Sequence, residues 1–258
     1  MDYNFHTHTW RCHHASGSME EYVLEAINSG IKFMGFSDHV PFVCSNGSES
    51  TYRVSAAEAE DYCNEVVALA EKYKDKIDII AGYEMEYYPN DFEKMLDTAI
   101  RTGGKYLILG EHFLEDESLG GHPSTFATDD CETLKKYCSR IVEAIATKKY
   151  TYVAHPDILN FTGDEEIYLN EMRKICAASK EYNIPLEINF LGIRDNRHYP
   201  NEKFLKLMGE EQNPVTFGCD AHSADVAFDE PSLKTALDYV EKYNLNYIGK
   251  PNLILINE

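Results

Sequence analysis

Short apolar runs alternate with longer amphipathic stretches along almost the whole chain. Seven runs have the length and the apolar content of buried strands, and an eighth, at 252–257, suits a final or edge strand. The seven are residues 2–5, 31–37, 77–84, 105–111, 150–155, 185–190 and 214–220. Strands that are apolar almost throughout are typical of a parallel sheet whose faces are covered by helices.

The stretches between these runs have helical periodicity and helix-boundary signals. We expect helices over about 18–29, 55–74, 91–102, 164–181, 201–209 and 231–243, with a further helix that ends near 147. Ser18 with Glu21, and Ser55 with Glu58, have the S-x-x-E spacing of a capping box. Seven or eight strand–helix units fit a closed barrel better than an open sheet. The pattern therefore predicts an α/β barrel formed by residues 1–258 as a single domain.

Charge and cysteine content narrow the classes of partner and compartment. The 258 residues include 44 acidic and 24 basic side chains, which gives a net charge of −20. Such a chain repels phosphate backbones, so neither long nucleic acid nor an anionic membrane is an expected partner. The start of the chain lacks a signal-peptide pattern, and no apolar stretch reaches the roughly 18 residues of a membrane span. Seven cysteines without a C-x-x-C pair indicate free thiols in a reducing cytoplasm.

Histidines and carboxylates lie where the predicted strands end. In parallel α/β barrels the side chains that carry chemistry lie at the carboxyl ends of the strands. In chain order these ends supply His6 and His8, Asp38 and His39, Glu84, Glu111 and His112, His155, Glu187 and Asn189, and finally Asp220 and His222. His13 and His14 follow the first strand within a histidine-rich stretch that also contains Cys12, as a ligand or a bystander. Six of the seven strands thus deliver a candidate metal ligand to one rim, and the sixth strand adds Glu187 and Asn189.

The spacing and chemistry of these residues indicate a metal centre. Residues two apart on a strand point to the same side, so His6 with His8, and Asp220 with His222, can each hold one ion. Imidazole nitrogen together with carboxylate oxygen suits Zn, Mn or Fe. The candidates exceed the needs of one tetrahedral ion and suffice for two or three. Ligands dispersed over the chain favour an active site over a structural zinc site.

The ordered motifs HTH, SDH, GYE, GEH, AHP and DAH resemble those of the PHP (polymerase and histidinol phosphatase) superfamily. The resemblance extends from His6 to His222, and the chain is most similar to the monofunctional histidinol-phosphate phosphatases. It implies a distorted (β/α)7 TIM-like barrel with three divalent metal ions. By this resemblance the first ion takes His6, His8, Glu84 and Asp220. Glu84 bridges to a second ion with His112 and His155, and the third takes His14, His39 and His222.

The segment EINFLGIRDNRHYPN after the sixth strand supplies candidates for phosphate binding. Arg194 or Arg197 is expected to hold phosphate oxygens in a bidentate way, with Arg194 favoured over Arg197, and His198 and Tyr199 are weaker candidates. Asp38 is expected to orient the site rather than bind metal. Glu86 competes with Glu84 as a ligand, and Glu84 is preferred. The acidic segment 113–130 is expected to be a lid that offers His122, or a solvated loop.

These residues predict metal-assisted hydrolysis of a small phosphomonoester, and the resemblance implies L-histidinol phosphate as the substrate in histidine biosynthesis. Asp220 or His222 is expected to protonate the leaving alkoxide, and Glu84 to bridge the ions. Three alternatives remain at this stage: a phosphodiesterase acting on another small ester or a nucleotide, a metal-dependent amidohydrolase, and a non-catalytic metal-binding protein. The sequence carries no signal for the oligomeric state.

Overall fold

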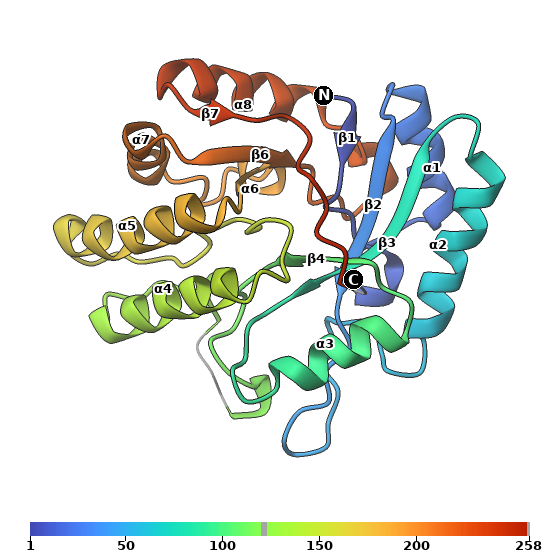
Figure 1. Cartoon of the computed structure of the whole chain (residues 1–258), viewed down its shortest axis with the longest axis horizontal. Coiled ribbons are helices and arrows are strands. Elements are labelled where there is room, and N and C mark those ends of the chain that lie inside the picture. The colour runs from blue at the N-terminus through green and yellow to red at the C-terminus, as the bar shows by residue number, and fades with distance from the viewer. Residues whose placement is uncertain (120–122, 257–258) are drawn as a thin grey trace.

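Parallel strands form two sheets that curl toward one another, and helices lie on their outer side (Figure 1). The computed structural model describes residues 1–119 and 123–256. The first sheet has the order β1 (Tyr3–Asn4), β2 (Phe33–His39), β3 (Asp78–Met85), β4 (Tyr106–Leu109). The second has the order β5 (Leu186–Asn189), β6 (Pro214–Gly218), β7 (Asn246–Tyr247). All neighbouring strands are parallel, as expected for this α/β class.

The predicted strand at 150–155 joins the two sheets. It pairs only through single bridges, in which Val153 contacts Leu109 of β4 and Leu186 of β5. Its backbone nevertheless bonds to β4, because the amide of Ala154 donates to the carbonyl of Leu109 at 2.8 Å. On the opposite side Thr7 bridges to Ala221 beyond β6. The strands therefore follow one another around a barrel-like ring, which confirms the predicted fold class.

The helices fall close to their predicted places on the outside of the sheets. They are α1 (Met19–Asn28), α2 (Ala59–Tyr73), α3 (Phe92–Arg101), α4 (Cys131–Ala146), α5 (Glu165–Tyr182), α6 (Phe190–Arg194), α7 (Glu202–Glu211) and α8 (Glu230–Lys242), with short 3-10 turns η1 (Trp10–Cys12), η2 (Glu117–Leu119) and η3 (Ala224–Val226). In Figure 1, α1 and α2 lie beside β2 and β3, whereas α4, α5, α7 and α8 stack on the other side.

Two helix boundaries test the capping signals. Ser18 and Glu21 form the predicted capping box at the start of α1. The second expected box is wrong in position, because α2 begins at Ala59 and Ser55 instead donates its hydroxyl to the Glu58 carboxylate at 2.6 Å in the preceding turn. The short helix α6 was not predicted. It begins directly after β5, where the Asn189 side chain accepts from the amide of Gly192 at 3.0 Å.

A second cluster of buried side chains lies among the strands of the first sheet and the 150–155 segment. Aromatic and aliphatic side chains of the first, fourth and fifth predicted strands fill the interior, namely Tyr3, Phe5, Tyr106, Ile108, Tyr152 and Ala154.

The C-terminal segment, expected as a strand or an edge, runs past β4, with one antiparallel bridge between Leu255 and Tyr106. Of the helices within the described residues, none has the length and apolar character needed to cross a membrane.

Candidate metal centre and substrate cavity

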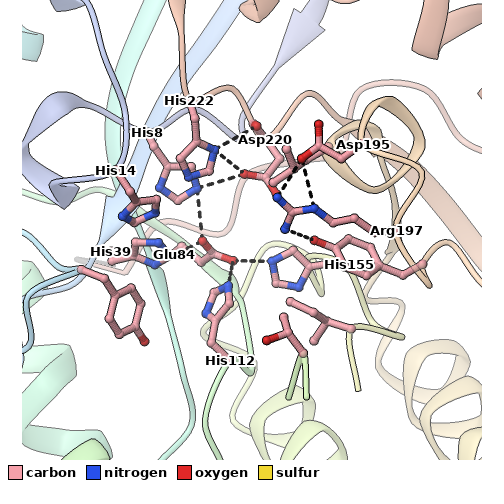
Figure 2. A pocket seen from close by; sticks show the side chains of 15 residues that line it. His8, His14, His39, Glu84, His112, His155, Asp195, Arg197, Asp220 and His222 are labelled. Atoms are coloured by element: carbon pink, nitrogen blue, oxygen red, sulfur yellow. Dashed lines mark hydrogen bonds and ion pairs between the residues drawn. The ribbon is translucent and has the colours of Figure 1, made fainter. Parts of the chain in front are cut away.

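The nine predicted metal-binding side chains converge at the carboxyl ends of the strands. His39 is the last residue of β2, Glu84 lies near the end of β3, and the β2–β3 register places these two residues side by side. The remaining seven lie on the loops that leave the strands, namely His6, His8, His14, His112, His155, Asp220 and His222. Figure 2 shows eight of the nine turned toward a common centre. The sequence pattern had placed them on one rim, and the folded chain brings them together.

Glu84 is at the centre of this cluster, and both of its oxygens face imidazoles. Its Oε2 lies 3.4 Å from nitrogens of His6, His8 and His39. Its Oε1 lies 2.9 Å from His155 Nε2 and 3.5 Å from His112 Nε2. The side chain is fully buried. A carboxylate placed between two groups of imidazoles in this way can bridge metal ions.

Asp220 and the remaining histidines extend the cluster. Asp220 Oδ1 lies 3.2 Å from His8 Nε2, 3.3 Å from His222 Nδ1 and 3.5 Å from His6 Nε2. The ring centroid of His14 lies 4.8 Å from that of His222 and 5.5 Å from that of His39.

Several of these atoms are buried without a hydrogen bond to any residue that the structure describes. They are His6 Nε2, His8 Nδ1, His39 Nδ1, His155 Nδ1, Asp220 Oδ1 and both carboxylate oxygens of Glu84. A buried polar atom without a partner is unfavourable by about 1 to 3 kcal/mol, so a concentration of them in one place calls for a ligand. Nitrogen and carboxylate oxygen are the donors that Zn, Mn and Fe accept. These residues therefore fit divalent metal ions.

The donor atoms form overlapping groups of three, within each of which they lie no more than 4.8 Å apart. The groups include His6–His8–Glu84, His39–Glu84–His112, His14–His39–His222 and His6–His155–Asp220. A further group combines His8 and His222 with Cys12, whose side chain is fully buried. Because the groups share members, they describe one continuous centre with room for more than one ion.

A second set of carboxylates holds the histidines from behind. Glu187 accepts from His6 Nδ1 at 2.8 Å and from the backbone amide of His155 at 2.9 Å. Glu86 lies 2.9 Å from His112 Nδ1. It therefore contacts the nitrogen of His112 that does not face Glu84. Such partners fix the imidazole tautomer and direct the other nitrogen toward the metal. Because Glu86 follows Glu84 by two residues, directly after the end of β3, period-two alternation was a signal that both side chains point to the same side of the sheet.

Asp38 also lies behind the ligands, as its position next to His39 suggested. Its carboxylate accepts from the amides of Thr9 at 3.0 Å and His39 at 2.9 Å, and it lies 3.6 Å from His8 Nδ1. These bonds tie the loop after β1 to the end of β2. Asp38 therefore contacts the backbone around the metal-binding histidines.

The histidines divide into two electrostatic classes. Burial lowers the pKa of His6 and His8, but nearby carboxylates outweigh it, and the pKa of His8 rises to about 9. Burial and the neighbouring His8 lower the pKa of His39 well below its usual value and that of His222 to about 3. In the metal-free protein, His39 and His222 are thus neutral and ready to coordinate, whereas a metal ion must displace protons from His6 and His8.

The backbone around the ligands is tight in two respects. His155 and Asp220 adopt φ angles of 30° and 47°, in the left-handed region that non-glycine residues rarely occupy. Gly110 leaves the space that the Glu84 carboxylate occupies, because a Cβ at this position would lie 1.9 Å from Glu84 Oε1. The side chains at the centre are therefore held in place by close backbone packing.

We expect Gly110→Ala to weaken metal binding and to lower kcat/KM at least about 10-fold, as the loss of a metal's supporting contact does. The added methyl group must displace the Glu84 carboxylate or the β4 backbone. Metal content after dialysis and phosphatase assays measure the effect. Gly47→Ala is the comparison variant: a Cβ at that loop position meets nothing within 4 Å, but the φ angle of 83° strains the backbone away from the cluster, so stability should fall and metal content should not change. Wild-type metal content in Gly110→Ala would contradict the expectation.

A cavity of about 420 Å³ opens above the metal-binding residues. Its floor is formed by the histidines, Glu84 and Asp220, and its walls by Tyr52, Thr125, Ile158, Leu191, Asp195, Arg197 and Tyr199. Tyr52, Thr125 and Asp195 were not among the predicted site residues. Asp195 lies within the segment EINFLGIRDNRHYPN, whereas Tyr52 and Thr125 lie on loops without a motif. The volume suits a small molecule rather than a polymer.

The two candidate arginines have different surroundings. Arg197 lines the cavity, where its guanidinium pairs with Asp195 at 2.8 Å and donates to the Tyr199 hydroxyl at 3.2 Å (Figure 2). Arg194 does not line it. Its guanidinium pairs with Asp229 at 2.7 Å and donates to the backbone carbonyl of Asp220 at 3.2 Å. This placement argues against the preferred phosphate-binding role of Arg194 and leaves Arg197 as the candidate.

The other candidates near the site contribute unequally. Tyr199 lines the cavity, whereas His198 is absent from its lining and bonds through Nε2 to the carbonyl of Ile158 at 2.7 Å. His13 is exposed. Within the acidic segment 113–130, Thr125 reaches the cavity, and His122 lies outside the described residues.

The chain belongs to the PHP domain family, whose profile matches residues 4–190. A histidinol-phosphatase of Bacillus subtilis (strain 168) is 27% identical over 254 residues, which cover 86% of this chain and 94% of that protein. A crystal structure of histidinol phosphate phosphatase from Lactococcus lactis, complexed with Zn, L-histidinol and phosphate, superposes with a TM-score of 0.71 at 19% identity, covering 95% of this chain and 94% of that chain. A protein of Listeria monocytogenes superposes with a TM-score of 0.74 at 21% identity, covering 90% and 99% of the two chains. The structural likenesses support the fold.

Proposed function

We propose that this protein is a metal-dependent phosphomonoesterase that hydrolyses L-histidinol phosphate to L-histidinol and phosphate. One observation carries the proposal: a cavity of small-molecule size has a floor of buried, unpaired metal-binding atoms and an arginine on its wall. Membership of the PHP domain family and the name of the Bacillus subtilis relative support the chemistry and the substrate.

We assign the nine side chains to three divalent ions, in keeping with their overlapping groups. His6, His8, Glu84 and Asp220 would hold the first, Glu84, His112 and His155 the second, and His14, His39 and His222 the third. When bound, such ions neutralise phosphoryl oxygens and lower the pKa of water toward neutrality. The donor set accepts Zn, Mn or Fe, and zinc is present in the Lactococcus lactis relative.

Arg197 would bind the phosphate group. A guanidinium presents two parallel N–H donors that match two phosphate oxygens. Its present partner, Asp195, also lines the cavity. When a phosphate group replaces Asp195 as the partner of the Arg197 guanidinium, the Asp195 carboxylate becomes available for the ammonium group of the substrate. This pair therefore offers one group for each end of a small amino-phosphate ester.

Asp220 is the preferred residue for proton transfer. Its Oδ1 is buried at the floor of the cavity without a hydrogen-bond partner. Burial would raise its pKa, but His6 and His8 outweigh burial and lower it well below the usual value, so the carboxylate is ionised. The ionised carboxylate can accept a hydrogen bond from the attacking water and orient it, so that a proton of that water passes to the leaving alkoxide. The lowered pKa of His222 keeps that ring neutral, so it lacks the acidic imidazolium proton of a general acid, which favours Asp220.

The proposal is tested by hydrolysis of a phosphomonoester panel after the protein is loaded with Zn, Mn or Fe. We expect strong preference for L-histidinol phosphate over mononucleotides and over a phosphodiester, and loss of turnover after chelation, with recovery when metal is restored. Turnover of other monoesters, or of the diester alone, would overturn the substrate and retain the metal centre. Metal binding without turnover of any ester would indicate a non-catalytic metal-binding protein.

A further inference from the structure

Arg53 is a fully buried cation close to the metal centre, on the loop between β2 and α2. Its side chain is 1% exposed, and a buried guanidinium is stable only where carboxylates and hydrogen-bond acceptors surround it. It forms an ion pair with Glu86 at 2.7 Å and another with Glu117 at 2.7 Å. It also donates to the carbonyl of Val40 at 3.3 Å and to the hydroxyl of Tyr52 at 3.0 Å. Neither the metal centre nor the cavity lining includes Arg53.

The Glu86 carboxylate connects Arg53 to His112, a candidate metal-binding residue. One of its oxygens, Oε2, faces Arg53, and the other, Oε1, lies 2.9 Å from His112 Nδ1. The Tyr52 hydroxyl donates to the same Oε1 at 2.9 Å. A carboxylate beside Nδ1 keeps the proton on that nitrogen and leaves Nε2 free, and Nε2 is the atom of His112 that faces Glu84. Arg53, Glu86 and His112 therefore form one continuous chain of contacts.

Arg53 also connects two loops that flank the cavity. The loop after β2 contains Tyr52, which lines the cavity and packs its ring against His39 at a centroid distance of 4.9 Å. The loop after β4 contains Glu117 in the turn η2. Besides the Arg53–Glu117 pair, the amide of Ser45 donates to Asp116 across the same two loops. The acidic segment after His112 is thus fastened in part by a cation from a distant loop.

We propose that Arg53 is a positioning residue for His112, which it controls by holding the Glu86 carboxylate against Nδ1 while it joins the loops 40–55 and 113–119. Arginine suits this role because its planar fork contacts two carboxylates at once, whereas a lysine ammonium is a single point of charge. The inference rests on the metal centre of the proposed function. It does not depend on which phosphate ester is hydrolysed.

The test compares Arg53→Lys, Tyr52→Phe and Glu117→Gln with the wild-type protein. The control is Arg101→Lys, which alters an exposed ion pair on α3. Zinc affinity is measured by competition with a chelator, and the protonation of His112 by ¹⁵N NMR of the metal-free protein. Thermal unfolding of each metal-free variant reports stability separately. None of these readouts uses a phosphate ester, so a failure of the proposed substrate leaves them intact.

We expect Arg53→Lys to weaken zinc binding about 10- to 100-fold, the range observed when an outer partner of a metal ligand is lost, and to shift the ¹⁵N signals of His112. Tyr52→Phe, which removes one donor to Glu86 and retains the ring, should cause a smaller change of the same kind. Glu117→Gln should lower the unfolding temperature and leave the His112 signals unchanged. Lower stability of Arg53→Lys with wild-type zinc affinity and His112 signals would overturn the proposal and leave Arg53 a purely structural residue.

Discussion

Glu84→Gln should abolish most of the metal binding and reduce kcat/KM by more than about 100-fold, beyond the loss that removal of an outer partner causes. The side chain has the same size, but its amide lacks the charge that faces five imidazoles. Both carboxylate oxygens lie within 3.5 Å of histidine nitrogens. Because the carboxylate faces both sides of the cluster, one substitution affects every ion that it contacts. Metal analysis and steady-state kinetics on L-histidinol phosphate measure the two effects.

The matched control for this change is Glu143→Gln on α4, where the carboxylate is exposed and pairs only with Arg140 in the described structure. It should retain wild-type metal content and turnover. Full metal occupancy together with full activity in Glu84→Gln would contradict the central position of Glu84. Full occupancy with lost activity would separate catalysis from metal binding and confine the role of Glu84 to the reaction.

Arg197→Lys should raise KM and lower kcat, with a combined loss of about 10²- to 10³-fold in kcat/KM. A lysine retains the positive charge but cannot offer two parallel donors to a phosphate group. Since Arg197 lies on the wall and its side chain hydrogen-bonds to Asp195 and Tyr199, metal content should not change. Kinetics on L-histidinol phosphate and metal analysis of the same samples test this separation.

Arg194→Lys is the control for that experiment, because it makes the same chemical change three residues away. Its ion pair with Asp229 faces away from the cavity. We expect a lower unfolding temperature and a KM close to that of the wild-type protein. A larger rise of KM in Arg194→Lys than in Arg197→Lys would assign phosphate binding to Arg194.

The position of the candidate metal-binding residues was predictable because the rule that places them is local. Each lies at the end of an apolar run, and the carboxyl ends of parallel strands share one edge of the sheet. His39 and Glu84, for example, are 45 positions apart in the sequence and adjacent in the β2–β3 register. Fold class and ligand position therefore followed from one pattern. The pairing of 150–155 was less predictable, since it depends on both flanking sheets.

The two arginines illustrate what the pattern left open. The direction of a side chain after β5 depends on the backbone that follows, and the short helix α6 had no separate signal in a segment predicted as strand up to 190. The helix turns Arg194 toward Asp229 and is followed by a loop that carries Arg197 into the cavity. The sequence offered two guanidinium groups in this segment and favoured Arg194, whereas the course of the backbone places Arg197 at the cavity.

By itself, the sequence determined the α/β barrel class and the rim where the candidate metal-binding side chains gather, because periodicity and strand ends are properties of neighbouring residues. Only the tertiary structure decided which carboxylates stand behind the ligands, which arginine faces the cavity and how Arg53 reaches Glu86. Arg53 and Glu86 belong to different loops and are brought to 2.7 Å by the packing of the whole barrel. Contacts of this kind depend on the relative placement of distant segments, which no local pattern of residues specifies.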